Sequence, residues 1–485
     1  MRFLEQLEIR LDSLSPTGRS AISVLSLAAL LVLSGMVCYR YLDVEAPAYI
    51  VDNLRPIPLL QNVFDIKAND YGIFRAREAS YLFNILDSWF IKVSAAAGLI
   101  NFLSLTHFLS LAVVLGIFFG FSKRFPLLHW FHRLLLALIF ASSPVIILSS
   151  FYFRTSKILA GVFAFALCCM FLSHRAIAPK QGTQSTWTWW EALAVFVLGF
   201  TLTITDEQGV LYAVCLEFVL VVLALFYRSE RWMRPAATLF LALVAYVLYR
   251  TAIGPYLTEY FSGAELETKL QEVYAFGKKD VVGKFGSVEE KGTDFAYLAW
   301  QFKYGVKLAR HWFDFYFGSF WPVSLLAMAG FIRAAYPANR KEDPSWRKWV
   351  PLALLIGITI QLVLADTLMI GRHPGLSHRF VHLVYYGLPF TMCILALSPV
   401  VLNTLLERRH VSKTWATLGM LLILTLNLIY LPHHLHVREI GTEKYSKIDH
   451  YLIGDRMRGC IQSKQVKVTE LLSEPSEIRL CQTLR

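Results

Sequence analysis

Apolar residues recur in uninterrupted runs of about 20 residues along most of the 485-residue chain, with short polar segments between them. A run of this length is what an α-helix needs to cross the hydrocarbon core of a bilayer. The runs lack the alternation of apolar and polar residues that is typical of transmembrane β-strands. Because every backbone N–H and C=O must be satisfied inside lipid, we predict an all-α, polytopic transmembrane helical bundle.

The pattern predicts eleven spans, with boundaries accurate to about three residues. They lie near residues 20–40, 102–122, 132–150, 157–174, 188–204, 209–227, 235–252, 311–333, 349–370, 380–404 and 414–431. No small-residue cleavage site follows the first span, so we expect it to stay as an uncleaved anchor. Residues 1–431 then form one bundle, and residues 432–485 form a tail.

The basic residues predict the orientation of the chain in the membrane. Lys and Arg concentrate in the loops that share the side of the N-terminus, for example at Arg228, Arg231 and Arg234. The positive-inside rule therefore predicts a cytoplasmic N-terminus and, with an odd number of spans, an outward (periplasmic) C-terminus. The absence of any Asn-x-Ser/Thr acceptor favours a bacterial inner (plasma) membrane.

The formal net charge of +12 does not indicate binding of nucleic acid. The basic residues are scattered over the inward loops, and no basic stripe with interleaved aromatic residues occurs. We expect the headgroups of anionic membrane lipids to be the partners of these loops.

Three long segments fall on the outward side, and we expect the chemistry there: residues 41–101, 253–310 and the tail. In the first, apolar residues from Ile73 to Phe90 recur at helical spacing and predict an amphipathic helix along the membrane surface. In the tail, Cys460 and Cys481 face the oxidising side of such a membrane. We predict that they form a disulfide.

A charged run in the first outward loop, between two long apolar segments, is the strongest candidate for one wall of an active site. Asp70 is the first candidate for a catalytic carboxylate and Asp65 is the second. The same wall carries the candidate substrate-binding residues Tyr71, Arg75, Arg77 and Glu78. The alternative is a capping acid on a solvated charged face, which is the more common role for a loop of this kind.

A second candidate is the short turn between the fifth and sixth spans. Asp206 and Glu207 are adjacent in it and repel one another, so at least one should need a cation, a metal or a proton. With Gln208 they are candidates for substrate binding, and a divalent cation held there is the one cofactor that the sequence suggests. The alternative is an ordinary polar turn closed by Gly209.

Two other outward turns carry cations that suit a phosphate. Arg154 and Lys157 flank hydroxyl side chains before the fourth span, where the alternative is snorkelling of long side chains to the membrane surface. The turn between the ninth and tenth spans can stabilise a phosphate leaving group. Its candidates are Arg372, His373, His378 and Arg379.

The arrangement of these parts resembles the GT-C class of integral-membrane glycosyltransferases. The shared parts are an anchor helix, a long acidic first outward loop with amphipathic helices, short hairpins, one acidic outward turn and an outward tail. Members of this class take sugars from polyprenyl-phosphate carriers, so the resemblance implies a polyprenyl-phosphate-linked sugar as donor and an envelope glycan, lipid or protein as acceptor. It implies that Asp70, or Asp65, is the base or substrate holder and that Arg154 contacts phosphate. Many members carry an adjacent acidic pair soon after the first span, whereas here the adjacent pair in a short outward turn is Asp206-Glu207.

Two other classes of function stay open. An O-antigen polymerase or ligase has a similar span count and uses outward Arg and His with a lipid diphosphate, but it does not need an acid-rich first loop. A transporter or lipid flippase is suggested by Glu217, which lies mid-way along the sixth span, where a charge is expensive. Transporters usually carry polar groups at the midplane, whereas the charge here lies at one face.

Overall fold

The computed structural model describes the following residues: 13–38, 46–65, 74–100, 102, 104–149, 155–176, 187–227, 230–263, 380–407, 411–443, 453–462, 472 and 475–485. Within these ranges every regular element is a helix and none is a strand, which confirms the all-α class. Three helices are long and apolar enough to cross a membrane: Leu105–Ser122, Ser156–Ser173 and Met233–Ser262. Shorter apolar helices lie at Trp130–Ala141, Trp189–Thr203, Thr391–Glu407 and Lys413–Ile429. The total of eleven spans stays a prediction, and those near 311–333 and 349–370 lie outside the described residues.

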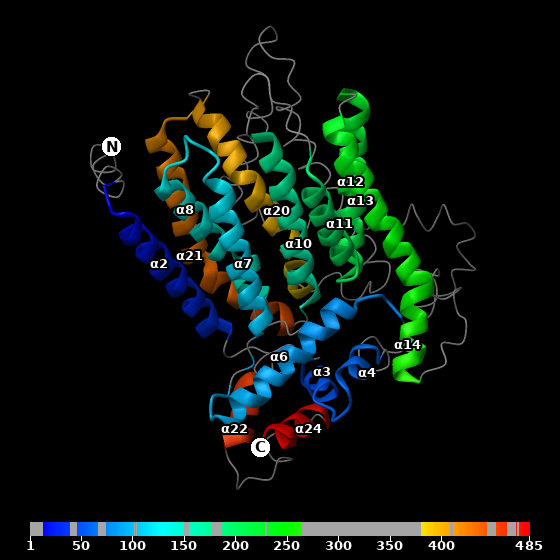
Figure 1. The fold of residues 1–485 in the computed structure, drawn as a ribbon. Coiled ribbons are helices and arrows are strands. Elements are labelled where there is room, and N and C mark those ends of the chain that lie inside the picture. Colours follow the sequence, from blue (N-terminus) through cyan, green and yellow to red (C-terminus); the bar gives the residue numbers. More distant parts are fainter. Residues whose placement is uncertain are drawn as a thin grey trace, which may run out of the picture.

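The apolar helices stand side by side as a bundle (Figure 1). Helix α10 (Ser156–Ala176) lies inside it and packs against α20 (Phe380–Glu407), α7 (Leu105–Ser122) and α11 (Trp189–Thr203). The remaining helices of the bundle are α2 (Pro16–Cys38), α8 (Trp130–Ala141), α9 (Pro144–Ser149), α12 (Glu207–Tyr227), α13 (Glu230–Leu248) and α21 (Lys413–Glu443).

The core of the bundle is a continuous set of large apolar side chains centred on α7 and α10. Phe118 and Phe165 have no exposed surface at all. Hydrogen bonds between helices add to this packing, for example between Asn427 Nδ2 on α21 and Ser142 Oγ, 3.2 Å away after α8. Because lipid tails are as apolar as these side chains, such close packing and hydrogen bonding hold helices together in a membrane.

The helices of the first loop and of the tail gather at one end of the bundle, which we call the loop end (Figure 1). They come from the first loop, as α3 (Ala46–Asn53), α4 (Leu59–Val63) and α6 (Glu78–Ala96), and from the tail, as α22 (Ile453–Gln462) and α24 (Pro475–Leu484). The two parts share a small apolar core of their own, which includes Ile50, Ile91, Met457 and Leu480. The loop and the tail therefore lie at the same end of the bundle, whereas α2 begins at the other end.

The predicted disulfide between Cys460 and Cys481 is confirmed, and it joins α22 to α24. Both cysteines are fully buried in the core that the tail shares with the first loop. Arg485 strengthens the junction, because its Nη2 donates to the carbonyl oxygen of Cys460 at 2.8 Å.

Helix α6 is the amphipathic helix expected in the first loop, but it begins at Glu78 rather than near residue 73. The chain before it cannot continue the helix, because Ala76 has a φ of +54°, in the left-handed region. The exposed face of α6 carries large apolar side chains, Leu86, Trp89 and Val93. A helix that turns such a face outward suits a position along a lipid surface.

Candidate functional site

Four charged side chains from three separate segments meet at the loop end. Arg77 is the N-cap residue of α6, Lys157 lies in the first turn of α10, and Asp206 and Glu207 stand where α12 begins. Lys157 Nζ forms an ion pair with Asp206 Oδ1. Arg77 Nη2 lies 3.2 Å from Glu207 Oε2 and 3.8 Å from Asp206 Oδ2. We call these four residues the charge cluster.

The charge cluster is shielded from solvent. The side chains of Lys157 and Asp206 are 4% and 0% exposed, and those of Arg77 and Glu207 are both 15% exposed. Buried charges are costly unless opposite charges compensate them. Of the three partners expected for the adjacent acids, a cation, a metal or a proton, the structure places cations beside them, Arg77 and Lys157. No group of three His, Cys, Asp or Glu side chains within the described ranges is arranged to hold a metal ion.

The two carboxylate oxygens of Asp206 have different surroundings. Oδ1 accepts from Lys157 Nζ and from the backbone N–H of Gln208, which is 2.8 Å away. Oδ2 accepts no hydrogen bond from any described residue. Burial by itself would raise the pKa of Asp206, but the charges of Lys157 and Arg77 and the two hydrogen bonds outweigh it and lower the pKa. Asp206 is therefore a fixed, ionised carboxylate whose buried Oδ2 lies 3.8 Å from Arg77 Nη2 and accepts no hydrogen bond from a described residue.

Glycine makes the turn that carries Asp206 possible. A Cβ atom at Gly209 would lie 2.1 Å from the carbonyl oxygen of Leu202, so only glycine lets the first turn of α12 come so close to the end of α11. This close approach brings Asp206 over the start of α10, where Lys157 lies.

The segment before α6 is held in place by contacts with one long, continuous helix. That helix runs from α13 through a π-helical turn, η1 (Tyr249–Ile253), into α14 (Gly254–Ser262). The ring of Phe74 lies against Gly254, where a Cβ atom would be 2.4 Å from Phe74 Cζ. Glu78 and Tyr249 are joined by a side-chain hydrogen bond. These two contacts fix the segment that carries Arg77.

A second tie joins α6 to the start of α10. The backbone N–H and the hydroxyl of Thr155 both donate to Asn84 Oδ1, at 3.1 Å and 2.9 Å. Thr155 stands two residues before Lys157, so this tie brings the two cations of the charge cluster to the same pair of acids.

The remaining predicted site residues are divided between described and undescribed parts of the chain. Asp65 forms an ion pair with Arg55 at 2.7 Å, and Arg55 also donates to Asn62 Oδ1, so Asp65 ties the first loop together. Arg75 is half-buried two residues before Arg77, and Gln208 is buried, with its backbone N–H donating to Asp206 Oδ1. The following candidates lie outside the described residues: Asp70, Tyr71, Arg154, Arg372, His373, His378 and Arg379.

The two largely buried cations, Arg77 and Lys157, can bind a phosphate. The two carboxylates beside them can accept a proton or a hydrogen bond from a hydroxyl group. Comparison with known proteins does not narrow the chemistry of the charge cluster further. No protein-family model matches the sequence, and no curated protein does either. The geometry of the charge cluster is therefore the basis for proposing a function.

Asp87 is a buried acid whose importance the sequence did not reveal. Its Oδ2 accepts from Ser104 Oγ at 2.5 Å, and its Oδ1 accepts from Thr106 N–H at 2.8 Å and from Thr106 Oγ1 at 3.0 Å. Burial raises the pKa of Asp87 to about 6, even though these hydrogen bonds lower it. Asp87 therefore fastens α6 to the start of α7. In the sequence it is one more acid among those of the first loop.

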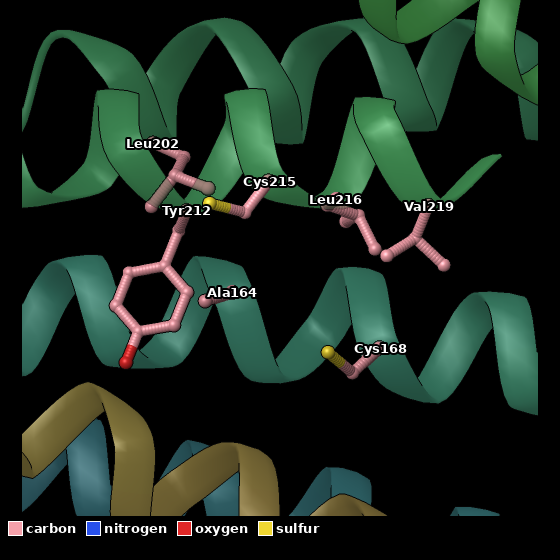
Figure 2. Close-up of a pocket in the computed structure, with 7 residues that line it drawn as sticks. All are labelled: Ala164, Cys168, Leu202, Tyr212, Cys215, Leu216 and Val219. Carbon is pink, nitrogen blue, oxygen red and sulfur yellow. The ribbon is translucent and has the colours of Figure 1, made fainter. Parts of the chain in front are cut away.

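An apolar pocket adjoins the turn that carries Asp206, between α10, α11 and α12 (Figure 2). The side chains that line it are Ala164, Cys168, Leu202, Tyr212, Cys215, Leu216 and Val219. Glu217 follows in the same helix as Tyr212 and is partly exposed, and its Oε2 has no hydrogen-bond partner among the described residues. The pocket is thus an apolar space next to a charged site.

Proposed function

We propose that this protein is a membrane glycosyltransferase that moves a sugar from a polyprenyl-phosphate donor to a hydroxyl group of an envelope glycan, lipid or protein. The observation that carries the proposal is the charge cluster, which gathers two cations and two acids at one end of an apolar bundle. A donor with a lipid chain, a phosphate and a sugar needs apolar surface, cations and hydrogen-bond acceptors at one depth of the membrane.

The cations suit the leaving group of such a reaction. Lipid phosphate departs as an anion, so it needs no general acid but does need positive charge close to its oxygen atoms. Lys157 and Arg77 offer an ammonium and a planar guanidinium fork in a nearly dry site, where charge interactions are strong. The predicted phosphate contacts Arg154, Arg372 and Arg379 would add to them.

The acids suit the acceptor and the sugar. An acceptor hydroxyl must lose its proton as it attacks the anomeric carbon, and a carboxylate within hydrogen-bond reach can take that proton. Other carboxylate oxygens can orient sugar hydroxyls, a role that we assign to Glu207. The resemblance to the GT-C class implies that Asp70 or Asp65 is the base.

The position that we expect for helix α6 puts Arg77 at the membrane depth where the donor phosphate would lie. Its exposed face carries Leu86, Trp89 and Val93, whereas its N-terminal end places Arg77 in the charge cluster. Tryptophan prefers the level of the lipid headgroups. If α6 lies at that level, Arg77 is at the depth of a lipid-linked phosphate.

Mass spectrometry of envelope glycans and carrier lipids, from cells with and without the gene, tests the proposal. We expect deletion to remove a sugar branch and to accumulate a polyprenyl phosphate that carries a single sugar. Accumulation of oligosaccharides on a lipid diphosphate would instead indicate a polymerase or ligase. Unchanged glycans and carriers would contradict a transferase and favour transport, with Glu217 as the next residue to change.

A further inference from the structure

We propose that Asp206 is the carboxylate that takes the proton of the acceptor hydroxyl, in place of Asp70 or Asp65. The inference rests on the proposed function, because it names the base for that reaction. It follows from the different surroundings of the carboxylates at the loop end.

Among the described carboxylates of the first loop and the α11–α12 turn, Asp206 is the most deeply buried one with an oxygen that accepts no hydrogen bond from a described residue. Glu78, whose Oε2 also accepts none, is 8% exposed against 1% for Asp206. Asp65 is bound to Arg55, and both oxygens of Asp87 accept hydrogen bonds from the start of α7. Asp206 Oδ2, the oxygen that accepts no hydrogen bond from a described residue, also has a fixed direction, because Lys157 and the Gln208 amide hold the other oxygen. A pre-oriented, buried acceptor is what a general base needs, since no reorganisation is required when the substrate arrives.

The flanking cations make proton transfer depend on the donor. Asp206 is faced by Lys157 from α10, by Arg77 from the N-cap of α6 and by Glu207 from its own turn. These cations keep Asp206 ionised while the site holds no phosphate. A donor phosphate would share the same two cations, and each shared cation would stabilise the carboxylate of Asp206 less. Binding of the donor would therefore make Asp206 a stronger base.

The bonds and the charge balance in the proposed step. The acceptor oxygen forms a bond to the anomeric carbon while the bond between that carbon and the phosphate oxygen breaks. The electron pair of the broken bond stays on the lipid phosphate, whose added negative charge lies against Lys157 and Arg77. The hydroxyl proton moves to Asp206 Oδ2 and passes to solvent when the products leave.

The test is complementation of the deletion strain with single variants, with the transferred sugar measured by mass spectrometry of the envelope glycan. Asp206→Asn keeps the cap on α12, because an amide oxygen can accept from the Gln208 N–H. We expect it to lower transfer by about 10²- to 10⁴-fold, the usual contribution of a general base. Asp52→Asn, which changes an acid on α3 outside the charge cluster, is the matched control and should transfer at the wild-type rate.

Asp206→Glu distinguishes two roles of Asp206, that of a general base and that of a carboxylate that only neutralises Lys157. The longer side chain keeps the charge but adds a methylene to a buried site, so either role allows a loss of about 1–3 kcal/mol of stability. A purely structural role predicts wild-type transfer per folded molecule, whereas a base predicts transfer per folded molecule reduced by about 100-fold, because the carboxylate is displaced by about 1 Å. Wild-type transfer in Asp206→Glu overturns the inference.

Measurement of transfer against pH, in membrane vesicles from the complemented cells, adds a readout that folding alone does not change. Wild-type transfer should fall at low pH as the base becomes protonated, and the residual transfer of Asp206→Asn should lack this fall. Loss of transfer in Asp70→Asn, with wild-type transfer in Asp206→Asn, would overturn the inference and leave the glycosyltransferase proposal intact. If the wild-type gene itself restores no sugar to the deletion strain, the proposed function fails.

Discussion

Lys157 Nζ and Asp206 Oδ1 form an ion pair between residues that are 49 positions apart in the chain. The pair joins the first turn of α10 to the turn before α12, and its two side chains are almost completely buried. At a buried position, the attraction of the partner offsets the free-energy cost of desolvating each charge. The loss of either partner therefore leaves an uncompensated charge.

Lys157→Met should lower the free energy of unfolding by about 3–5 kcal/mol, the usual effect of removing one partner of a buried ion pair. Arg77 Nη2, 3.8 Å from Asp206 Oδ2, compensates only part of the loss. The double variant Lys157→Met/Asp206→Asn should recover most of the stability, since it leaves no unpaired charge. Thermal unfolding of the detergent-purified single and double variants gives the coupling energy.

Lys413→Met is the matched control for this cycle, because Lys413 is an exposed lysine in the first turn of α21. It should change stability by less than about 1 kcal/mol. Strictly additive effects of Lys157→Met and Asp206→Asn would contradict a coupled buried pair.

A glycine substitution tests the geometry of the turn. The Cβ atom of Gly209→Ala would lie 2.1 Å from a backbone oxygen, which cannot move without shifting α11. We expect a loss of about 1–3 kcal/mol from overpacking, together with loss of the proposed sugar transfer as Asp206 is displaced. Gly116→Ala in α7 is the control, because a Cβ atom there meets nothing within 4 Å. Equal thermal midpoints for the two alanine variants would contradict a tight turn at Gly209.

The fold class follows from the sequence because lipid leaves the backbone few choices, and long apolar runs must become helices. The need of the Asp206-Glu207 pair for a cation, a metal or a proton is also predictable, because adjacent carboxylates repel wherever they lie. The source of that cation is not predictable in the same way. Arg77 comes from a distant loop, and its place depends on the contact between Phe74 and Gly254.

Local errors in the prediction have local causes. The apolar spacing places the start of α6 near residue 73, but a left-handed residue at Ala76 delays it to Glu78. Spacing cannot reveal a backbone angle. In the same way, Asp65 and Asp87 are both acids of one loop in the sequence, and only packing makes one an ion-pair partner and the other a buried anchor.

Asp87 should make stability depend on pH. Its pKa is raised to about 6 in the folded protein, so the folded state binds more protons than the unfolded state between about pH 4 and pH 6. The free energy of unfolding should therefore fall by about 3 kcal/mol as pH rises through this range and stay level above it. Thermal unfolding of the purified protein from pH 4 to pH 7 measures the slope.

Asp87→Asn should remove that slope, because the amide resembles the protonated acid. Its oxygen can accept from the Thr106 N–H, and its NH₂ group can donate to Ser104 Oγ. Asp52→Asn should keep the slope of the wild-type protein. The same pH dependence in Asp87→Asn as in wild type would assign the slope to another group.

The disulfide should control how firmly the tail is docked on the first loop. Cys460 and Cys481 close a loop with a sequence separation of 21 residues, and such a crosslink stabilises a fold by about 3 kcal/mol. Without it, the apolar side chains of Met457 and Leu480 would have to hold the tail on Ile50 and Ile91 by packing alone. We expect the double variant Cys460→Ser/Cys481→Ser to open locally more often while the bundle stays folded.

Limited trypsin digestion of the purified protein measures this opening at Arg456, Arg458 and Arg479, which lie in α22 and α24. Cleavage should be at least tenfold faster in the double variant, and dithiothreitol should produce the same effect in the wild-type protein but no further effect in the variant. Cys215→Ser removes a free cysteine of α12, and trypsin should cleave this variant at the wild-type rate. If dithiothreitol leaves the wild-type cleavage rate unchanged, apolar packing alone is enough to hold the tail on α3 and α6.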